Sequence, residues 1–170
     1  VKSRLPWLLF LMLSATVTQM IMNSYEAALA VMPQLAGFIP MLTGTGGNCG
    51  SQSSTLVIRG LAIGEIEFRD LLKVIWKEVR IAVCISIILA VVNGARIVIM
   101  GQGDAMMALT IGVTMACTVI IAKVVGCTLP LVAKKVGLDP AIMATPLIST
   151  LVDISTISVY FAIVSFVFHL

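Results

Sequence analysis

The sequence ATPLISTLVDISTISVYFAIVSFVF, residues 144 to 168, decides the fold class that we expect for this chain. It is largely apolar and carries one charged residue, Asp153. A helix of about 20 apolar residues is long enough to cross the hydrocarbon core of a bilayer. A carboxylate in that core costs several kcal/mol unless it meets water, a cation or a partner. The stretch therefore predicts a membrane span in which Asp153 lines a path for a positively charged solute.

The composition of the whole chain also predicts a membrane protein. Of its 170 residues, 59% are hydrophobic and 11% are charged, and the mean hydropathy is +1.11. A soluble domain has roughly 25% charged residues. The net charge of +3 is not gathered with aromatic residues on one face, so no nucleic-acid partner is expected. His169 is the only histidine, which excludes a multi-histidine zinc centre and leaves a poor base for a catalytic triad. We therefore expect no enzyme.

Hydropathy along the chain predicts five transmembrane helices in one all-α domain that covers residues 1–170. The spans are expected at about residues 5–22, 27–63, 79–100, 105–129 and 144–168, and the second is interrupted by Pro33, Pro40 and a glycine-rich stretch. Apolar residues recur at helical spacing between Glu65 and Glu78, which predicts an amphipathic helix on the inner membrane surface. A plain solvated linker is the alternative. The chain is expected to be a multi-pass protein of the cell membrane.

The distribution of lysine and arginine predicts the orientation, because cytoplasmic loops carry an excess of these residues. If the N-terminus is inside, nine of the 11 basic residues fall on the cytoplasmic side: Lys2, Arg4, Arg59, Arg69, Lys73, Lys77, Arg80, Lys134 and Lys135. Arg96 falls outside, and Lys123 lies within the fourth span. Five spans then place the C-terminus outside.

The densest polar signal is TGTGGNCGSQSST, residues 43 to 55. Its polar groups would lack partners in lipid, so the stretch should pack against other helices or line water. Gly46 and Gly50 are four residues apart, a spacing that lets two helix backbones approach closely. Asn48 and Gln52 are also four apart and share a face, from which they could bind a neighbouring helix or the waters around an ion. Packing and pore lining are both consistent with this pattern.

The charged residues Asp153 and Lys123 have alternative interpretations. If the last span begins near Ala144, Asp153 lies about 14 Å along it, near the middle of a core about 30 Å thick. Asp153 could instead form a structural ion pair with Lys123, although we expect Lys123 to reach toward the inner surface or a helix terminus.

Asp139 precedes Pro140 in a short basic loop, which is typical of a helix N-cap. Asp104 is expected in an outer loop.

Two separated motifs resemble the MgtE family of magnesium channels. The first, PMLTGTGGNCGSQSST at residues 40–55 followed by RGLAIGEI at 59–66, is similar to the signature of the family's second helix. The second resembles its last two helices and comprises LPL at residues 129–131, GLDPA at 137–141 and TPLISTLVD at 145–153. The likeness covers essentially the whole chain.

This resemblance implies a homodimer of five-helix subunits with a pore on the two-fold axis. It implies that Asp153 of both subunits holds hydrated Mg²⁺, and that Asp139 lies at the inner mouth, where bound Mg²⁺ favours closure. Thr145 and Pro146 would lie near the pore. Thr156 stands where the family often has glycine. The chain shows no counterpart of the cytoplasmic N-domain and paired CBS domains that gate family members, which implies a transmembrane fragment or a form regulated in another way.

The chemistry of the residues agrees with what the resemblance implies. Mg²⁺ gives up its first water shell reluctantly, so two Asp153 carboxylates could bind the hydrated ion through its waters. A membrane potential that is negative inside drives a divalent cation inward, so a channel needs no other energy source. Mn²⁺, Co²⁺ and Ca²⁺ are alternative ions. The alternative functions are a proton- or sodium-coupled divalent-cation transporter and a non-conducting structural membrane subunit.

Overall fold

The computed structural model describes the backbone of residues 5–169, and their side chains except those of 6, 7 and 141–145. Lys2 and Arg4, which contribute to the predicted orientation, lie outside the described residues. All regular elements within the described part are helices, as predicted. They are α1 (Leu5–Ser24), α2 (Glu26–Val31), α3 (Gln34–Ala62), the 3-10 helix η1 (Phe68–Asp70), α4 (Leu71–Ile99), α5 (Ala105–Lys135) and α6 (Pro140–Phe168).

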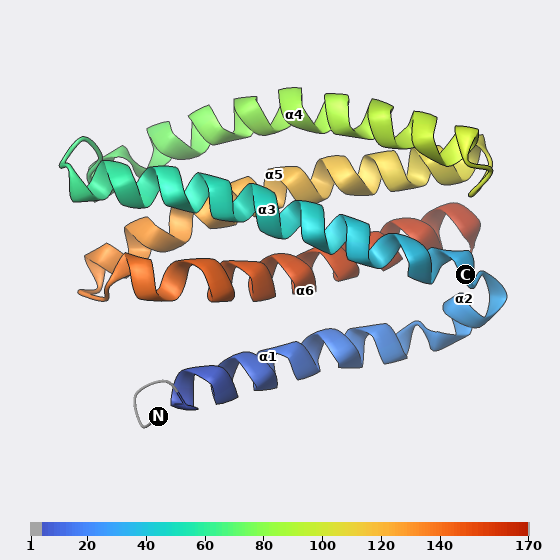
Figure 1. Ribbon diagram of the computed structural model, residues 1–170, viewed down its shortest axis with the longest axis horizontal. Coiled ribbons are helices and arrows are strands. Elements are labelled where there is room, and N and C mark those ends of the chain that lie inside the picture. The colour runs from blue at the N-terminus through green and yellow to red at the C-terminus, as the bar shows by residue number, and fades with distance from the viewer. Residues whose placement is uncertain (1–4, 170) are drawn as a thin grey trace.

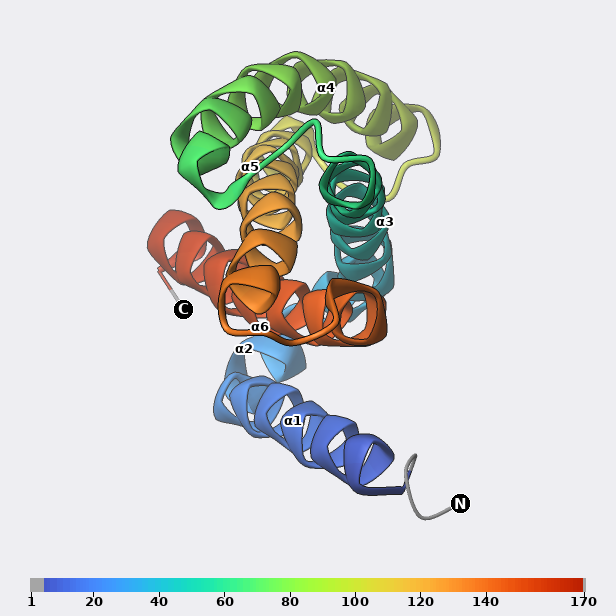
Figure 2. The same cartoon turned by 90° about the vertical axis from the view of Figure 1, so that its left-hand side faces the viewer.

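Helix α5 is the centre of the bundle. The four long helices α3 to α6 run side by side along the long axis of the molecule (Figure 1). Seen from the end, α5 lies between α4 and α6, with α3 beside it (Figure 2), and α5 contacts all three. Its buried side chains include Ile111, Met115 and Val119, which belong to the main hydrophobic core. Helix α5 therefore provides the surface against which α3, α4 and α6 all pack.

Helix α1 lies at the edge of the bundle, on the far side of α6 from α5 (Figure 2). It packs against α6, and just beyond its C-terminal end Tyr25 stacks on Phe161, with ring centroids 4.4 Å apart and planes 3° from parallel. Most of its other large apolar side chains, such as Leu8, Leu13 and Met20, are exposed in the single chain. The apolar surface of α1 therefore requires lipid or another protein chain as its surroundings.

Three helices are long and apolar enough to cross a membrane, on the criterion of length and composition applied to the described residues. They comprise residues Phe68–Ile99, Ala105–Lys135 and Pro146–Phe168. The apolar helix at Leu8–Ser24 is shorter, and α3 contains the polar stretch 43–55, which lowers its hydropathy. The structure thus agrees with a helical membrane protein.

Several helix boundaries differ from those expected. The break in the second predicted span falls at Met32 and Pro33, because a residue before proline is driven toward extended conformations; Met32 has φ −129° and ψ 77°. Beyond this break α3 continues unbroken through Pro40 and the glycine-rich stretch. Helix α4 takes in most of the segment that was expected to form a separate amphipathic helix. Helix α5 passes Pro130, and α6 already begins at Pro140.

Glycines set the distance between α3 and α5. A Cβ atom added to Gly126 of α5 would overlap the backbone carbonyl oxygen of Gly50 on α3. A Cβ on Gly46 would lie 2.7 Å from both Thr118 Cγ2 and Val152 Cγ1, and one on Gly50 would lie 2.7 Å from Ile148 Cγ2. The glycine-rich part of α3 therefore packs closely against α5 and α6 within one chain, at a spacing that leaves no room for larger side chains at Gly46 and Gly50.

We predict that Gly126→Ala destabilises the bundle, because the new methyl group meets backbone that cannot rotate away. Overpacking of this kind costs about 1–3 kcal/mol, which lowers the melting temperature by several degrees. The matched control is Gly112→Ala on the same helix, where the new Cβ would make an ordinary 3.5 Å contact with Ala90 Cβ. Thermal unfolding of the purified protein in detergent measures both. Equal melting temperatures for the two variants would contradict the close crossing.

Candidate functional site

Helix α3 presents two different faces. Its inner face is buried, with large apolar side chains near the start of the helix and mainly small residues in the middle: Gly46, Cys49, Gly50, Ser53 and Ser54. Asn48 and Gln52 are exposed on the other face. They line an open groove of about 640 Å³ together with Ser51, Thr55 and Leu56. Of the two roles that the sequence left open, packing therefore belongs to the glycines, whereas the amide side chains point out of the bundle.

Asp153 lies near the middle of α6, beside α3. The neighbouring residue Val152 is fully buried against Gly46 and Gly50, and Ser149, one turn earlier, faces Gly47. Asp153 itself is half-buried. Within the described part of the chain, its carboxylate makes no hydrogen bond or ion pair. The packing of Val152 thus holds a carboxylate without a protein partner next to the glycine-rich helix.

A single chain does not assemble a conventional metal site from its described residues. No group of three or more histidine, cysteine, aspartate or glutamate side chains converges among them. Thr150 and Ser155 donate to the backbone carbonyls of Pro146 and Leu151, whereas the buried Thr156 hydroxyl has no hydrogen-bond partner among the described residues. One chain therefore contributes one carboxylate at this position, and a divalent cation bound there would need further oxygens from water or from another chain.

A buried polar cluster joins α3, α4 and α5 away from Asp153. Lys123 Nζ lies 3.0 Å from Glu78 Oε2 and donates a hydrogen bond to Ser53 Oγ at 3.1 Å. Ser53 Oγ in turn donates to Glu78 Oε2 at 2.5 Å. All three residues are buried, with exposed fractions of 3% for Lys123, 5% for Glu78 and 0% for Ser53. The cluster is a closed triangle in which each polar group has a partner inside the protein.

The predictions about Lys123 were wrong. Lys123 is buried and pairs with Glu78 of α4, so it does not reach toward the inner surface or a helix terminus, and the alternative ion pair with Asp153 is not formed. Sequence reasoning missed this pair by assigning Glu78 to a surface helix that ends where the third span was expected to begin. A signal was present: a lone lysine inside an apolar span needs a buried acidic partner, and Glu78 directly precedes the apolar run of the next helix.

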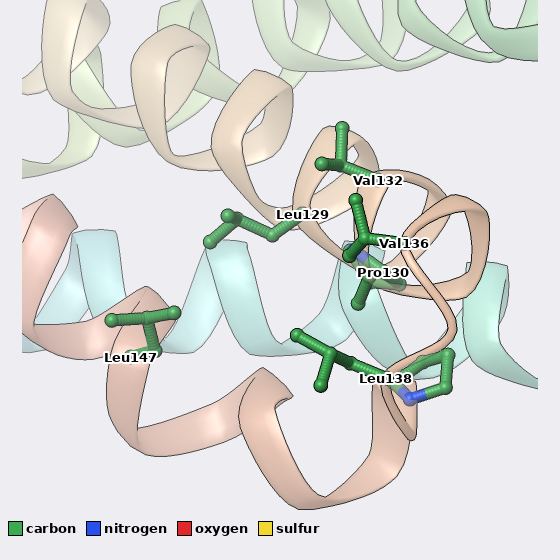
Figure 3. Close-up of a pocket in the computed structure, with 8 residues that line it drawn as sticks. Leu129, Pro130, Val132, Val136, Leu138 and Leu147 are labelled. Carbon is green, nitrogen blue, oxygen red and sulfur yellow. The ribbon is translucent and has the colours of Figure 1, made fainter.

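The other predicted site residues lie toward the start of α6. Asp139 is exposed in the loop directly before Pro140. Pro146 lies inside α6 and is exposed, and the side chain of Thr145 lies outside the described residues. Beside this loop is a small pocket of about 90 Å³ between α5 and α6, in which Leu129, Leu138 and Leu147 face the same space (Figure 3). Its apolar lining is unsuited to a hydrated cation.

Asp104 has a clear local role. Its Oδ1 accepts a hydrogen bond of 2.8 Å from the backbone N–H of Met107, so it is the N-cap of α5. Nearby in the same loop, Gln102 Oε1 accepts a hydrogen bond of 3.0 Å from the Arg96 guanidinium. Asp104 is therefore an acidic residue whose position the local backbone explains, in contrast to Asp153.

Comparison with known proteins identifies relatives of this chain. A family model described as "MgtE: Divalent cation transporter" matches residues 39–163. The chain is 33% identical over 161 residues to a protein of Thermus thermophilus named "Magnesium transporter MgtE", and the match covers 95% of this chain and 35% of the relative. A protein of the same name from Bacillus subtilis is 35% identical over 166 residues, covering 98% and 37% respectively. The chain thus spans about a third of the length of the curated relatives it matches.

We predict that breaking the buried ion pair lowers the free energy of unfolding much more than replacing both of its residues with uncharged ones. Lys123→Met alone leaves the Glu78 carboxylate buried without a cation and should cost about 3–5 kcal/mol. The double variant Lys123→Met/Glu78→Gln removes both charges and keeps similar volumes, so most of that loss should be recovered.

The free energy of unfolding of the wild type, the two single variants and the double variant, determined in detergent, forms a complete double-mutant cycle. A double variant whose loss equals the sum of the two single losses would show that the side chains do not interact.

Proposed function

Because this chain belongs to the MgtE family of divalent cation transporters, we propose that it forms the pore of a magnesium channel. The named relatives are transporters rather than enzymes, which agrees with the expectation from the sequence. The observation that carries the proposal is Asp153, a half-buried carboxylate near the middle of an apolar helix with no protein partner among the described residues. Such a group is expected to serve a cation path.

We propose that two copies of the chain assemble around a two-fold axis. One chain offers a single carboxylate at this depth, and two copies would provide about two negative charges for one divalent cation. The exposed polar groove along Asn48 and Gln52 supports the same arrangement, because polar side chains on a membrane helix need water or protein beside them. In this arrangement α1, α3, α4, α5 and α6 cross the membrane, with the N-terminus inside.

Mg²⁺ is the proposed substrate and passes in hydrated form. The ion prefers octahedral oxygen surroundings and keeps its waters, so the Asp153 carboxylates accept hydrogen bonds from those waters. The Asn48 and Gln52 amides carry both donors and acceptors and can bind the same water shell. A monovalent cation gains less Coulomb energy from the two carboxylates than a divalent cation does. A membrane potential of 100 mV supplies about 4.6 kcal/mol for a divalent ion, enough to drive it inward without a coupled ion.

Asp139 is proposed as a second, weaker magnesium site at the inner mouth. It lies in the exposed loop that leads into α6, and so it is connected to Asp153 by the helix itself. Bound Mg²⁺ at this loop would favour closure, which makes the ion an inhibitor of its own entry. Thr145 and Pro146 occupy the first turns of α6 between the two aspartates and are proposed to lie near the pore.

We predict that Asp153→Asn lowers magnesium flux at least tenfold, because the amide keeps the shape of the side chain but removes the charge that attracts the ion. Flux is measured with a magnesium-sensitive dye in proteoliposomes. The control is Asp104→Asn, which also removes one carboxylate but keeps the N-cap, since asparagine caps helices as well as aspartate does. Magnesium flux that is unchanged in Asp153→Asn would falsify the selectivity role.

A further prediction separates a channel from a coupled transporter. A channel carries Mg²⁺ down its gradient at a rate that depends on membrane potential and needs no counter-ion gradient. We therefore expect magnesium entry into proteoliposomes without sodium and without movement of protons beyond the background of empty vesicles. Proton or sodium transport in fixed proportion to magnesium would support the transporter instead, and no flux at all would support a structural subunit.

A further inference from the structure

The conduction mechanism makes no use of the buried cluster of Ser53, Glu78 and Lys123, although the cluster holds two opposite charges inside the bundle. We propose that this cluster fixes the rotation of α3 about its own axis, so that Asn48 and Gln52 face away from the bundle. Its consequence for ion flux rests on the proposed pore function. The rotation itself is a property of one chain and does not depend on that function.

The geometry of the triangle favours a positioning role. Ser53 is the only member on α3, and it is held by Glu78 of α4 at 2.5 Å and by Lys123 of α5 at 3.1 Å. Hydrogen bonds of this kind are directional and weaken when the donor turns aside. Successive residues of a helix are about 100° apart, so a rotation of α3 by one residue would carry Ser53 away from both partners.

Packing alone provides less control over this rotation. In the middle of α3, from Gly46 to Ser54, the buried side chains are small, and the contact with α5 at Gly50 and Gly126 is between backbones. Larger buried side chains lie nearer the start of the helix, at Leu35, Phe38, Ile39 and Leu42. Contact between two backbones fixes the distance between the helices, but it provides few side-chain ridges that would oppose rotation. Buried polar groups can supply that specificity, because leaving them without partners is costly. The cluster thus adds a directional constraint on the rotation of α3 in the part of the helix where the buried side chains are small.

Ser54 provides an internal comparison. It is adjacent to Ser53 and equally buried, at 1% exposed, but its hydroxyl has no hydrogen-bond partner among the described residues. Burial of a serine on this face therefore does not by itself create a polar contact. Ser53 has one because it meets the Glu78 and Lys123 side chains. The two serines form a matched pair for testing the proposal.

Rotation can be measured with cysteine pairs between α3 and α6. A Cβ on Gly47 would lie 3.7 Å from Ser149 Oγ, which is close enough for a Gly47→Cys/Ser149→Cys disulfide after small adjustments. The pair Asn48→Cys/Ser149→Cys reports the next position around α3. The four native cysteines, all of them free thiols, are first replaced by alanine. The ratio of the oxidation rates of the two pairs in detergent then measures how α3 is turned relative to α6.

With the native cluster, the pair at positions 47 and 149 should oxidise at least ten times faster than the pair at 48 and 149. Ser53→Ala should reduce this ratio at least fivefold, and so should the double variant Glu78→Leu/Lys123→Met, which leaves Ser53 without either partner, whereas Ser54→Ala should leave it unchanged within twofold. An Ala90→Cys/Gly112→Cys pair controls for general loosening, because it joins α4 to α5 and does not involve α3. Its oxidation rate should be the same in every background.

The outcomes distinguish the two proposals. A ratio that stays unchanged in both Ser53→Ala and the double variant would overturn the positioning role, even if those variants melt at lower temperatures, since a merely stabilising cluster would not alter rotation. If the ratio falls as expected, magnesium flux of Ser53→Ala should fall in parallel, while flux of Ser54→Ala should not. A changed ratio in a protein whose native form conducts no Mg²⁺ would refute the pore function and leave the positioning role intact.

Discussion

The close approach of α3 and α5 at Gly50 and Gly126 is the contact on which the rest of the structure depends. No side chain larger than hydrogen fits at Gly126, because a Cβ atom there would overlap the backbone of Gly50. This contact draws the polar stretch of α3 into the bundle, beside the central helix. It also brings Val152 of α6 against Gly46, which sets the position of Asp153 one residue further along the chain.

The two charged features of the bundle differ in how their charge is compensated. Glu78 and Lys123 compensate each other's charge and both contact Ser53, so removing only one of them would destabilise the protein more than keeping the pair. Asp153 has no such partner among the described residues and is only half-buried. A carboxylate in that condition is stable in a membrane only if water or a cation reaches it. The Glu78–Lys123 pair is therefore consistent with a structural role, and Asp153 is consistent with a position on a path for ions.

Among the described residues, the single chain exposes surfaces of opposite character. The groove along Asn48 and Gln52 is polar, whereas the exposed side of α1 is apolar. Lipid can cover the second surface but not the first, because hydrocarbon cannot satisfy amide groups. A second copy of the chain that encloses water against α3 would resolve this difference. The proposed dimer would meet that requirement.

The sequence by itself determined the helical membrane class, the family, and Asp153 as an unusual charge, because hydropathy, motif order and a lone carboxylate are all local properties of the chain. It also indicated that Gly46 and Gly50 suit close packing. Only the tertiary structure decided that Lys123 pairs with Glu78, that Asn48 and Gln52 turn outward, and that α3 continues unbroken through its glycines. These features depend on which helices lie side by side and how each is rotated, and spacing along one helix does not specify the side chains that a neighbouring helix presents to it.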